Sequence, residues 1–266
     1  MARAKSEGER ATARLRREVA RSVDAPAALL PHFDALFRGM PSLGSSPGRV
    51  VSMLDRAGIG PKSRVVDLAC GKGTLAIALA RRLGCTVIGV DACAPFIAEA
   101  NDATDRAGVS DRVQFIEMDV QVFARGRRGA FDGALMMGLF PIEVARQVLR
   151  PLVAPGGCYV IDDVFRDERL TANERAFDEI PTKEETRALL ERGRDRVVEV
   201  DLPPPSRVRS MEAALYRRLR SNAKRIGREH PGVRAALATF LANQRGANRL
   251  LGRELRPAVW VVRRGQ

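Results

Sequence analysis

Apolar residues in the middle of the chain gather in short continuous runs that alternate with amphipathic stretches. Such runs are typical of strands buried on both faces of a parallel sheet, whereas apolar residues three and four apart indicate helices. The runs predict strands at residues 63–70, 86–91, 113–119, 131–137, 158–165, 195–202 and 256–264. The amphipathic stretches predict helices at residues 48–58, 73–84, 95–108, 141–152 and 183–193. This alternation predicts an α/β fold with a doubly wound, mostly parallel seven-stranded sheet.

Helical patterns also occur outside this alternation. An N-terminal helix is indicated by Leu29, Leu30, Phe33, Leu36 and Phe37. Roughly fifty residues separate the last two strands, far more than a connecting loop needs. Two apolar stripes fill this insert, and they consist of Met211, Leu215, Leu219 and Ile226, and of Val233, Leu237, Phe240 and Leu241. We therefore divide the chain into an N-terminal helical segment (1–45), a core (46–205), a helical insert (206–254) and a final core strand (255–266). The N-terminal segment and the insert are expected to form a lid.

Composition narrows the functional classes. No apolar run has the length of a membrane span, so no membrane partner is expected. Cys70, Cys85, Cys93 and Cys158 form no metal-binding spacing, and the chain has only two histidines, so no metal site is expected. The charged N-terminus lacks the apolar region of a secretory signal. These features favour a cytoplasmic protein with reduced thiols.

Positive charge is concentrated near the C-terminus. The whole chain has a net charge of +13, and the segment from Ser206 onward contains 15 lysines and arginines but only three acids. Arginines such as Arg217, Arg218 and Arg220 can meet an anionic acceptor or nucleic acid, or can form a solvated face. The oligomeric state does not follow from this pattern.

The residues most suggestive of chemistry follow the first core strand. Gly71 and Gly73 lie in the turn before the next helix, where glycine permits a tight turn and the close approach of a ligand. The helix directs its N-terminal amides into the same crevice. Asp91 ends the second strand about 20 residues further on, where a carboxylate can accept hydrogen bonds from a ribose. This arrangement predicts a nucleotide-like ligand at the carboxyl ends of the strands.

The glycine turn alone fits nicotinamide dinucleotides as well as S-adenosylmethionine. Asp67 favours the second ligand, because nicotinamide enzymes usually place an apolar residue at this point of the strand. Asp119 also favours it, because it follows the third strand, where a carboxylate can bond an adenine amino group. Lys72 is not a phosphate-loop lysine, because no glycine stands five residues earlier and no Ser or Thr follows it.

This series of motifs resembles the class I S-adenosylmethionine-dependent methyltransferases over roughly residues 43 to 200, and the last strand fits too. The segments before the motif and after the fifth strand are similar to small-molecule methyltransferases of the ubiquinone-biosynthesis-like type. The resemblance implies a Rossmann-like methyltransferase fold, S-adenosyl-L-methionine as cofactor and methyl transfer to a small-molecule acceptor. The family's Asp-x-Gly-x-Gly-x-Gly motif here reads Asp67-Leu-Ala-Cys-Gly-Lys-Gly73, so Ala69 replaces the first glycine.

The resemblance also implies which residues hold the cofactor. The methionine end would be bound by Asp67, Ala69, Gly71 and Gly73, and the ribose by Asp91 and Ala92. The adenine edge would be bound by Asp119 and Val120, and the amino group of the ligand by the backbone near Met136. Asp91 and Asp119 also have explanations that involve no ligand, because Asp91 can cap a helix and Asp119 can form a turn at the strand end.

No catalytic residue follows from the sequence. Methyl transfer mainly needs alignment of the acceptor and exclusion of water, and a general base only where the acceptor must lose a proton. Asp163 ends the fifth strand beside Asp162, His32 lies in the N-terminal helix and Tyr216 lies in the insert. These three are the candidates, but capping is the better explanation of Asp163, a solvent-facing or core position is the better explanation of His32, and packing explains Tyr216 equally well.

Three other functions compete with small-molecule methyl transfer. An RNA- or ribosome-directed methyltransferase would use the basic C-terminal region, but this region offers few aromatic side chains for stacking bases. The residues MMGLFP also stand where amino-directed base methylases usually carry an Asn-Pro-Pro-Tyr-type segment. A non-catalytic module would bind the cofactor without turnover. Reduction with NAD is disfavoured by Asp67 and Asp119.

Overall fold

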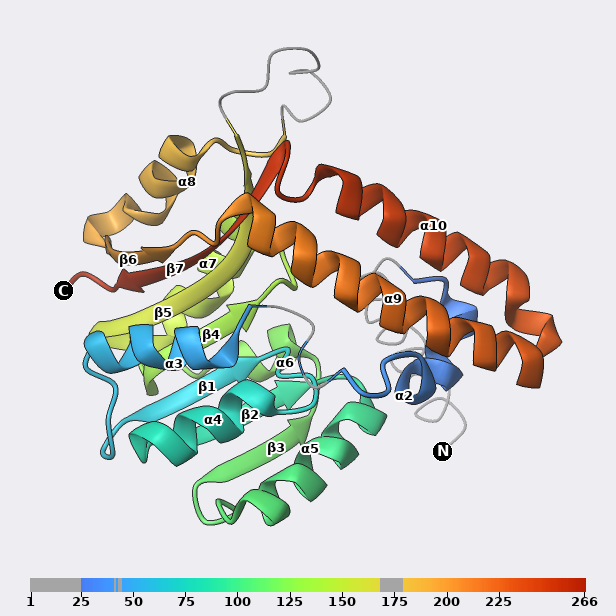
Figure 1. The fold of residues 1–266 in the computed structure, drawn as a ribbon. Coiled ribbons are helices and arrows are strands. Elements are labelled where there is room, and N and C mark those ends of the chain that lie inside the picture. Colours follow the sequence, from blue (N-terminus) through green and yellow to red (C-terminus); the bar gives the residue numbers. More distant parts are fainter. Residues whose placement is uncertain (1–24, 41, 43–44, 168–178) are drawn as a thin grey trace, which may run out of the picture.

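A computed structural model describes residues 25–40, 42, 45–167 and 179–266. Within these ranges, one sheet has the strand order β3-β2-β1-β4-β5-β7-β6 (Figure 1). The strands are β1 (Arg64–Leu68), β2 (Thr86–Asp91), β3 (Val113–Glu117), β4 (Phe131–Met137), β5 (Val153–Arg166), β6 (Arg196–Asp201) and β7 (Leu255–Arg263). Neighbours among β1 to β5 are parallel, and β7 is antiparallel to both β5 and β6. The expected seven-stranded, mostly parallel sheet is confirmed.

Helices cover both faces of this sheet, which is why strands such as β4 and β7 are mostly apolar and buried. One face packs against α3 (Pro47–Arg56), α4 (Thr74–Leu83) and α5 (Ala94–Ala107). The other packs against α6 (Val120–Ala124), α7 (Ile142–Leu152) and α8 (Lys183–Leu190). Two buried cores result, with Val65, Leu79 and Val160 in the first and Val66, Leu149 and Tyr159 in the second.

Two core elements differ from the sequence-based expectation. The short helix α6 was not predicted, because its five residues are too few for a periodic pattern. Strand β5 begins at Val153 rather than at residue 158, so it includes the Pro-Gly-Gly segment. Gly157 makes this continuation possible, since a Cβ there would lie 2.6 Å from the backbone oxygen of Asp132. A larger residue would force the two strands apart.

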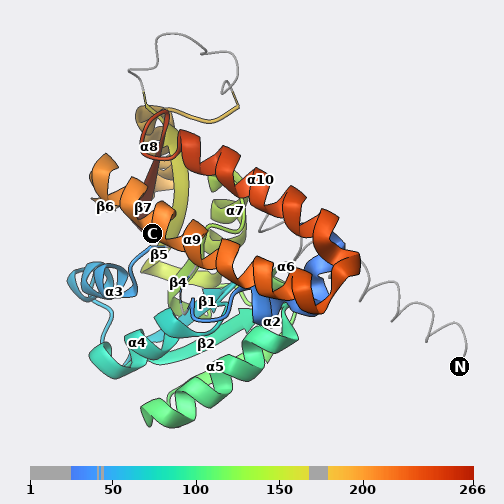
Figure 2. The ribbon, with the colours of Figure 1, turned by 45° about the vertical axis from the view of Figure 1, so that its right-hand side comes forward.

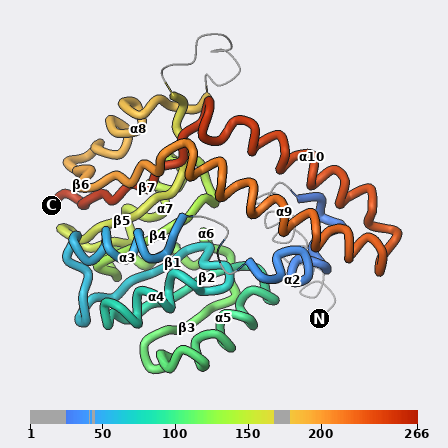
Figure 3. Tube along the Cα trace, viewed as in Figure 1, coloured from blue at the N-terminus to red at the C-terminus, as the bar shows by residue number. Residues whose placement is uncertain are grey.

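A separate group of helices lies beyond the carboxyl ends of the strands. This helical cluster consists of η1 (Ala27–His32), α2 (Phe33–Leu36), α9 (Pro205–Glu229) and α10 (Arg234–Leu250). Figures 1 and 2 show α2 between α5 and α9, and Figure 3 shows α9 and α10 as a long antiparallel pair. Leu29, Phe33, Leu219, Ile226 and Phe240 form its buried interior. Met211, which the sequence placed in the buried stripe of the insert, is instead exposed.

The described ranges hold neither a bilayer-spanning helix nor a metal-binding cluster. None of the helices there is long and apolar enough to cross a bilayer. In the same part of the chain, no three or more histidine, cysteine or acidic side chains gather where a metal ion could be held. The cysteines Cys70, Cys85, Cys93 and Cys158 are free.

Candidate active site

The turn between β1 and α4 has a left-handed backbone at three positions. The φ angles are 59° at Ala69, 54° at Gly71 and 72° at Gly73. Glycine adopts such angles freely, whereas a side chain costs about 1–2 kcal/mol. Ala69 therefore occupies a glycine-type position at some cost in strain. The amide of Cys70 donates to the Val90 oxygen at 3.1 Å, which fastens the turn to the end of β2.

The two glycines of the turn serve different purposes. A Cβ built on Gly71 would meet nothing within 4 Å, so the main chain there is open to an approaching ligand. A Cβ on Gly73 would lie 2.3 Å from Cζ of Phe115, a side chain of β3. Gly73 is therefore required by packing, while Gly71 leaves the room that a ligand needs.

Asp91 holds the open part of the turn in place. Its Oδ2 accepts a hydrogen bond from the Gly71 amide at 2.8 Å, and its Oδ1 accepts one from the Cys93 amide at 2.9 Å. Burial raises the pKa of this carboxyl, and the backbone amides partly oppose that shift. A carboxylate has about four acceptor positions, so Asp91 retains capacity for a hydroxyl of a bound ribose.

Asp67 is a buried acid with one unpaired oxygen among the described residues. Its side chain is 2% exposed, and Oδ2 has no hydrogen-bond partner among the described residues. Burial, followed by the charge of Asp91, raises the pKa of Asp67 to about 7. The register pairs Asp67 with Gly89, so both residues and Asp91 face the α3–α4 side of the sheet.

An unpaired buried oxygen calls for a donor. S-adenosylmethionine carries an ammonium group and ribose hydroxyls, so the chemistry of these residues fits this molecule. Asp67 and the open amide backbone near Gly71 would face its methionine end, and Asp91 would face its ribose.

The remaining cofactor candidates lie at the same edge of the sheet, and most of their side chains are already engaged in the fold. Asp119 caps α6, where its Oδ1 accepts from the amides of Gln121 at 2.8 Å and Val122 at 2.9 Å. The Met118 amide donates to the backbone oxygen of Asp91 at 3.0 Å, so the ends of β2 and β3 lie side by side. The side chains of Val120 and Met136 are buried in the core on the α7 face, and Ala92 is half-buried beside Asp91.

The two acids at the end of β5 point to opposite faces of the sheet. Asp163 accepts hydrogen bonds from the amides of Ile142 at 2.8 Å and Val164 at 2.7 Å, so its carboxylate fixes the start of α7. Asp162 faces the α3–α4 side with Asp67, because β5 and β1 are both in register with β4. It is 8% exposed and accepts from the Ser45 amide at 3.2 Å.

Asp162 also has the electrostatics of a proton acceptor. Burial raises its pKa to about 6, opposed by Ser45 and assisted by Asp163 and Asp201. The pKa of Glu212 on α9 is raised by burial and then by the charge of Asp162, which places α9 near this strand end. The sequence analysis named Asp163 as the candidate, but strand register puts Asp162, and not Asp163, on the face of the glycine turn.

The other two catalytic candidates, His32 and Tyr216, make contacts within the helical cluster. The His32 ring lies 4.5 Å from the His230 ring, centroid to centroid, where η1 meets the end of α9. The Tyr216 hydroxyl accepts from Nε and Nη2 of Arg245 at 3.2 and 3.1 Å, between α9 and α10. Both contacts hold helices together, so neither side chain gains support as a catalyst.

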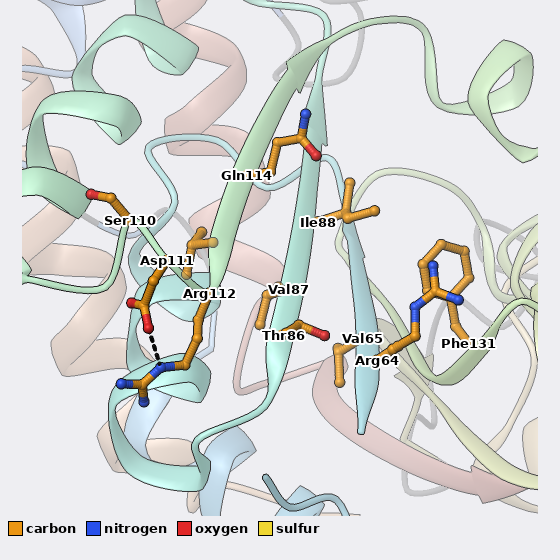
Figure 4. Close-up of a pocket in the computed structure, with 11 residues that line it drawn as sticks. Arg64, Val65, Thr86, Val87, Ile88, Ser110, Asp111, Arg112, Gln114 and Phe131 are labelled. Carbon is orange, nitrogen blue, oxygen red and sulfur yellow. Dashed lines mark hydrogen bonds and ion pairs between the residues drawn. The ribbon is translucent and has the colours of Figure 1, made fainter. Parts of the chain in front are cut away.

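A pocket of about 270 Å³ lies elsewhere, at the amino ends of β1, β2 and β3 (Figure 4). Arg64 and Arg112 stand at its two sides, with Ile88 and Gln114 between them. Arg112 pairs with the adjacent Asp111 at 3.1 Å, and Arg64 is exposed. We place the active site at the opposite ends of the strands, because ligands of such sheets bind there and the buried unpaired acid lies there.

Comparison with known proteins shows which proteins the chain resembles. Residues 65–157 match a family of proteins described as a methyltransferase domain. The uncharacterized protein YjhP of Escherichia coli K12 is 30% identical over 122 residues, which are 44% of this chain and 46% of YjhP. The X-ray structure of YjhP superimposes with a TM-score of 0.73 at 20% identity, covering 90% of this chain and 100% of that chain.

Two relatives carry descriptions of activity. The ubiquinone biosynthesis O-methyltransferase of Paracidovorax citrulli AAC00-1 is 32% identical over 111 residues, which are 40% of this chain and 45% of that protein. A methyltransferase from Geobacter sulfurreducens, solved with S-adenosyl-L-homocysteine, has a TM-score of 0.72 at 21% identity, covering 86% of this chain and 96% of that chain.

The sequence matches thus span less than half the length of these curated relatives, and the structural likeness extends over most of the chain. The sheet order, the glycine turn and the domain match agree with one another. Residues 65–157 are therefore similar to a methyltransferase domain, and the fold of most of the chain is like that of the methyltransferase solved with S-adenosyl-L-homocysteine.

Proposed function

We propose that the protein transfers a methyl group from S-adenosyl-L-methionine to a hydroxyl group of a small-molecule acceptor. The observation that carries this proposal is the buried Oδ2 of Asp67, unpaired among the described residues, beside a glycine turn that Asp91 braces. A cationic ligand with donor groups completes this arrangement, whereas a neutral apolar ligand leaves the oxygen unpaired.

The end of β5 supports a hydroxyl acceptor. Asp162 is buried on the same face as Asp67, and its raised pKa of about 6 lies close to neutral pH, where a general base is most effective. A hydroxyl must lose its proton as its oxygen forms the new bond to carbon, and the proposal assigns that proton to the carboxylate of Asp162. The O-methyltransferase of Paracidovorax citrulli is similar to this chain through part of the same core.

The helical cluster is proposed to serve as the lid over this site. Phe33 and Phe37 pack against Phe96, which lies in the first turn of α5, shortly after the end of β2. Such a cover excludes water, which strengthens the electrostatic interactions beneath it. An anionic acceptor has little support, because Asp162 and Glu212 place negative charge on this side, while Arg217 and Arg218 are exposed to solvent.

Removal of the Asp91 carboxylate tests the cofactor half of the proposal. The wild-type protein is expected to bind S-adenosylmethionine and not NAD when the two are titrated side by side by calorimetry. Asp91→Ala should weaken S-adenosylmethionine binding about 10- to 100-fold, because it removes charge-assisted hydrogen bonds to the ribose and loosens the Gly71 turn. Asp102→Ala, an exposed acid of α5, is the matched control. Equal affinity of the two variants would remove Asp91 from the site.

Removal of the Asp162 carboxylate tests the transfer half. With phenols and catechol as trial acceptors, S-adenosylhomocysteine formation should follow the ionised fraction of Asp162 and rise with pH through about 6. Asp162→Asn should lower turnover roughly 100- to 10,000-fold and abolish this rise, with little change in S-adenosylhomocysteine affinity.

Asp163→Asn is the control for this experiment. It weakens the hydrogen bond to the Ile142 amide, so it should lower thermal stability while the pH dependence of turnover remains. Turnover in Asp162→Asn at the wild-type rate and pH dependence would remove Asp162 as a base. Tight cofactor binding with no product from any acceptor would instead favour a non-catalytic module.

A further inference from the structure

Lys72 is a nearly buried cation at the centre of the glycine turn. Its side chain is 10% exposed, although lysine ordinarily keeps its ammonium group in water. Nζ lies 2.8 Å from Oε2 of Glu99 and 5.5 Å from the centroid of the Phe96 ring. Nζ also donates a hydrogen bond to the backbone oxygen of Phe37 at 3.1 Å. These contacts compensate the burial of the charge, and the last of them leads out of the core into the helical cluster.

The oxygen that Lys72 bonds belongs to the carboxyl end of α2. Carbonyl groups at such an end lack partners within the helix and carry partial negative charge, which favours a cation. The neighbouring carbonyls of Leu36 and Arg38 accept hydrogen bonds from Nδ2 of Asn222 on α9, at 2.9 and 3.0 Å. Thus the turn after α2 is fastened on one side by the glycine turn and on the other by the insert.

Helix α2 needs such fastening, because α2 has four residues and η1 has six. Helices of this length do not persist alone in water. Apolar packing supplies part of what holds α2, since the Phe37 ring lies 5.9 Å from Phe96 and 6.3 Å from Phe240, centroid to centroid. Packing of this kind is not directional. The hydrogen bond from Lys72 instead fixes which part of α2 lies against the glycine turn.

We propose that Lys72 is a positioning residue that locks the helical cluster onto the cofactor turn, so that closure of the lid and retention of the cofactor are coupled. The backbone of Lys72 lies between Gly71 and Gly73, so its direction depends on the left-handed turn that Asp91 braces. A ligand that orders this turn also orders the bond to Phe37. By thermodynamic linkage, an ordered lid then strengthens binding of that ligand by the same factor. This inference rests on the proposed function.

Lys72→Met tests the lock, because methionine retains the apolar stem and loses the ammonium group. Hydrogen exchange of the amides at residues 33–40 should become about tenfold faster in the protein without added ligand, as expected for loss of a charge-assisted hydrogen bond. Dissociation of S-adenosylhomocysteine, followed by stopped flow, should accelerate by a similar factor. Lys62→Met, an exposed lysine outside the turn, is the matched control and should change neither rate.

Two further variants separate positioning from a general loss of structure. Lys72→Arg retains the charge and the donors, so it should recover part of both effects. Asn222→Ala releases α2 from the α9 side without touching the turn, so coupling requires that it too accelerates S-adenosylhomocysteine dissociation. The proposal is overturned if Lys72→Met leaves exchange at residues 33–40 unchanged, or if Asn222→Ala loosens α2 and dissociation keeps its wild-type rate.

Failure of the proposed function gives a different result. If the wild-type protein binds neither S-adenosylmethionine nor S-adenosylhomocysteine, the cofactor assignment is wrong and the coupling to cofactor retention goes with it. The exchange measurement on the free protein still decides whether Lys72 holds α2. Binding by the wild type with no effect of Lys72→Met on either rate rejects the lock and leaves the enzyme assignment intact.

Discussion

Asp67→Asn is expected to make the free protein more stable at pH 8 and to remove most of its affinity for S-adenosylmethionine. The carboxyl of Asp67 is buried, and one of its oxygens has no hydrogen-bond partner among the described residues. Its charged form is therefore costly in the free protein and becomes useful only when a ligand donor meets it. An amide of the same shape avoids that cost and cannot supply the negative charge.

The direction of the expected change in stability follows from how the stability of the folded protein depends on pH. Burial raises the pKa of Asp67 from 3.8 to about 7, so the folded protein holds a proton that the unfolded chain releases. The resulting stabilisation is complete below the unfolded pKa and is lost as pH rises through about 7. Because each tenfold change in proton affinity corresponds to about 1.36 kcal/mol, the loss is at most on the order of 4 kcal/mol.

Chemical denaturation between pH 5 and 8 measures this dependence. Asp162 contributes in the same direction, but its pKa of about 6 places its loss at lower pH, so the interval from 6 to 8 mainly reports Asp67. Asp67→Asn should flatten the wild-type decline in that interval. S-adenosylmethionine affinity should fall roughly 10- to 100-fold, the effect of losing a hydrogen bond to a charged group.

Asp102→Asn, on the exposed side of α5, should change neither the pH dependence nor the affinity. Unaltered S-adenosylmethionine binding in Asp67→Asn would show that the unpaired oxygen does not face the cofactor. A less stable variant at pH 8 would show that Asp67 stabilises the fold, in conflict with its orphaned oxygen.

The arrangement of the core could be predicted from sequence because it depends on local patterns. Strands buried on both faces are apolar along their whole length, and turn glycines mark where they end. The match of Asp67, Gly71, Gly73 and Asp91 to a known motif then indicated the ligand class. Conformation was harder to foresee, since Ala69 adopts a left-handed angle that alanine ordinarily avoids.

Partners across long sequence distances could not be predicted in the same way. Lys72 meets the backbone of Phe37, 35 positions earlier, through a folding of the N-terminal segment that no periodic pattern records. The face to which Asp162 points depends on the pairing of β5 with β4, because a shift of one residue would exchange it with Asp163. Asp119 matched the motif, yet its Oδ1 caps α6, a helix too short to predict.

Gly73→Ala is expected to destabilise the fold far more than Gly71→Ala, although both glycines belong to one motif. The new methyl group at residue 73 would lie 2.3 Å from Cζ of Phe115 and 3.0 Å from Cβ of Ala100. Overpacking of this kind costs about 1–3 kcal/mol, and the left-handed φ of 72° adds about 1–2 kcal/mol. Gly71→Ala bears only the second cost, because its Cβ meets no atom within 4 Å.

A double-mutant cycle separates the two costs by chemical denaturation. In the Phe115→Ala background the ring is absent, so Gly73→Ala should lose about 1–3 kcal/mol less stability than it does in the wild type. Gly71→Ala should show no such coupling, and its main effect should be weaker S-adenosylmethionine binding, since its methyl group projects into the open side of the turn. Ala69 already shows that this turn tolerates a side chain at a positive φ, so the ring of Phe115 is what makes residue 73 intolerant. Equal destabilisation by the two glycine variants, with no rescue from Phe115→Ala, would mean that backbone conformation alone selects both glycines and that the packing account of Gly73 is wrong.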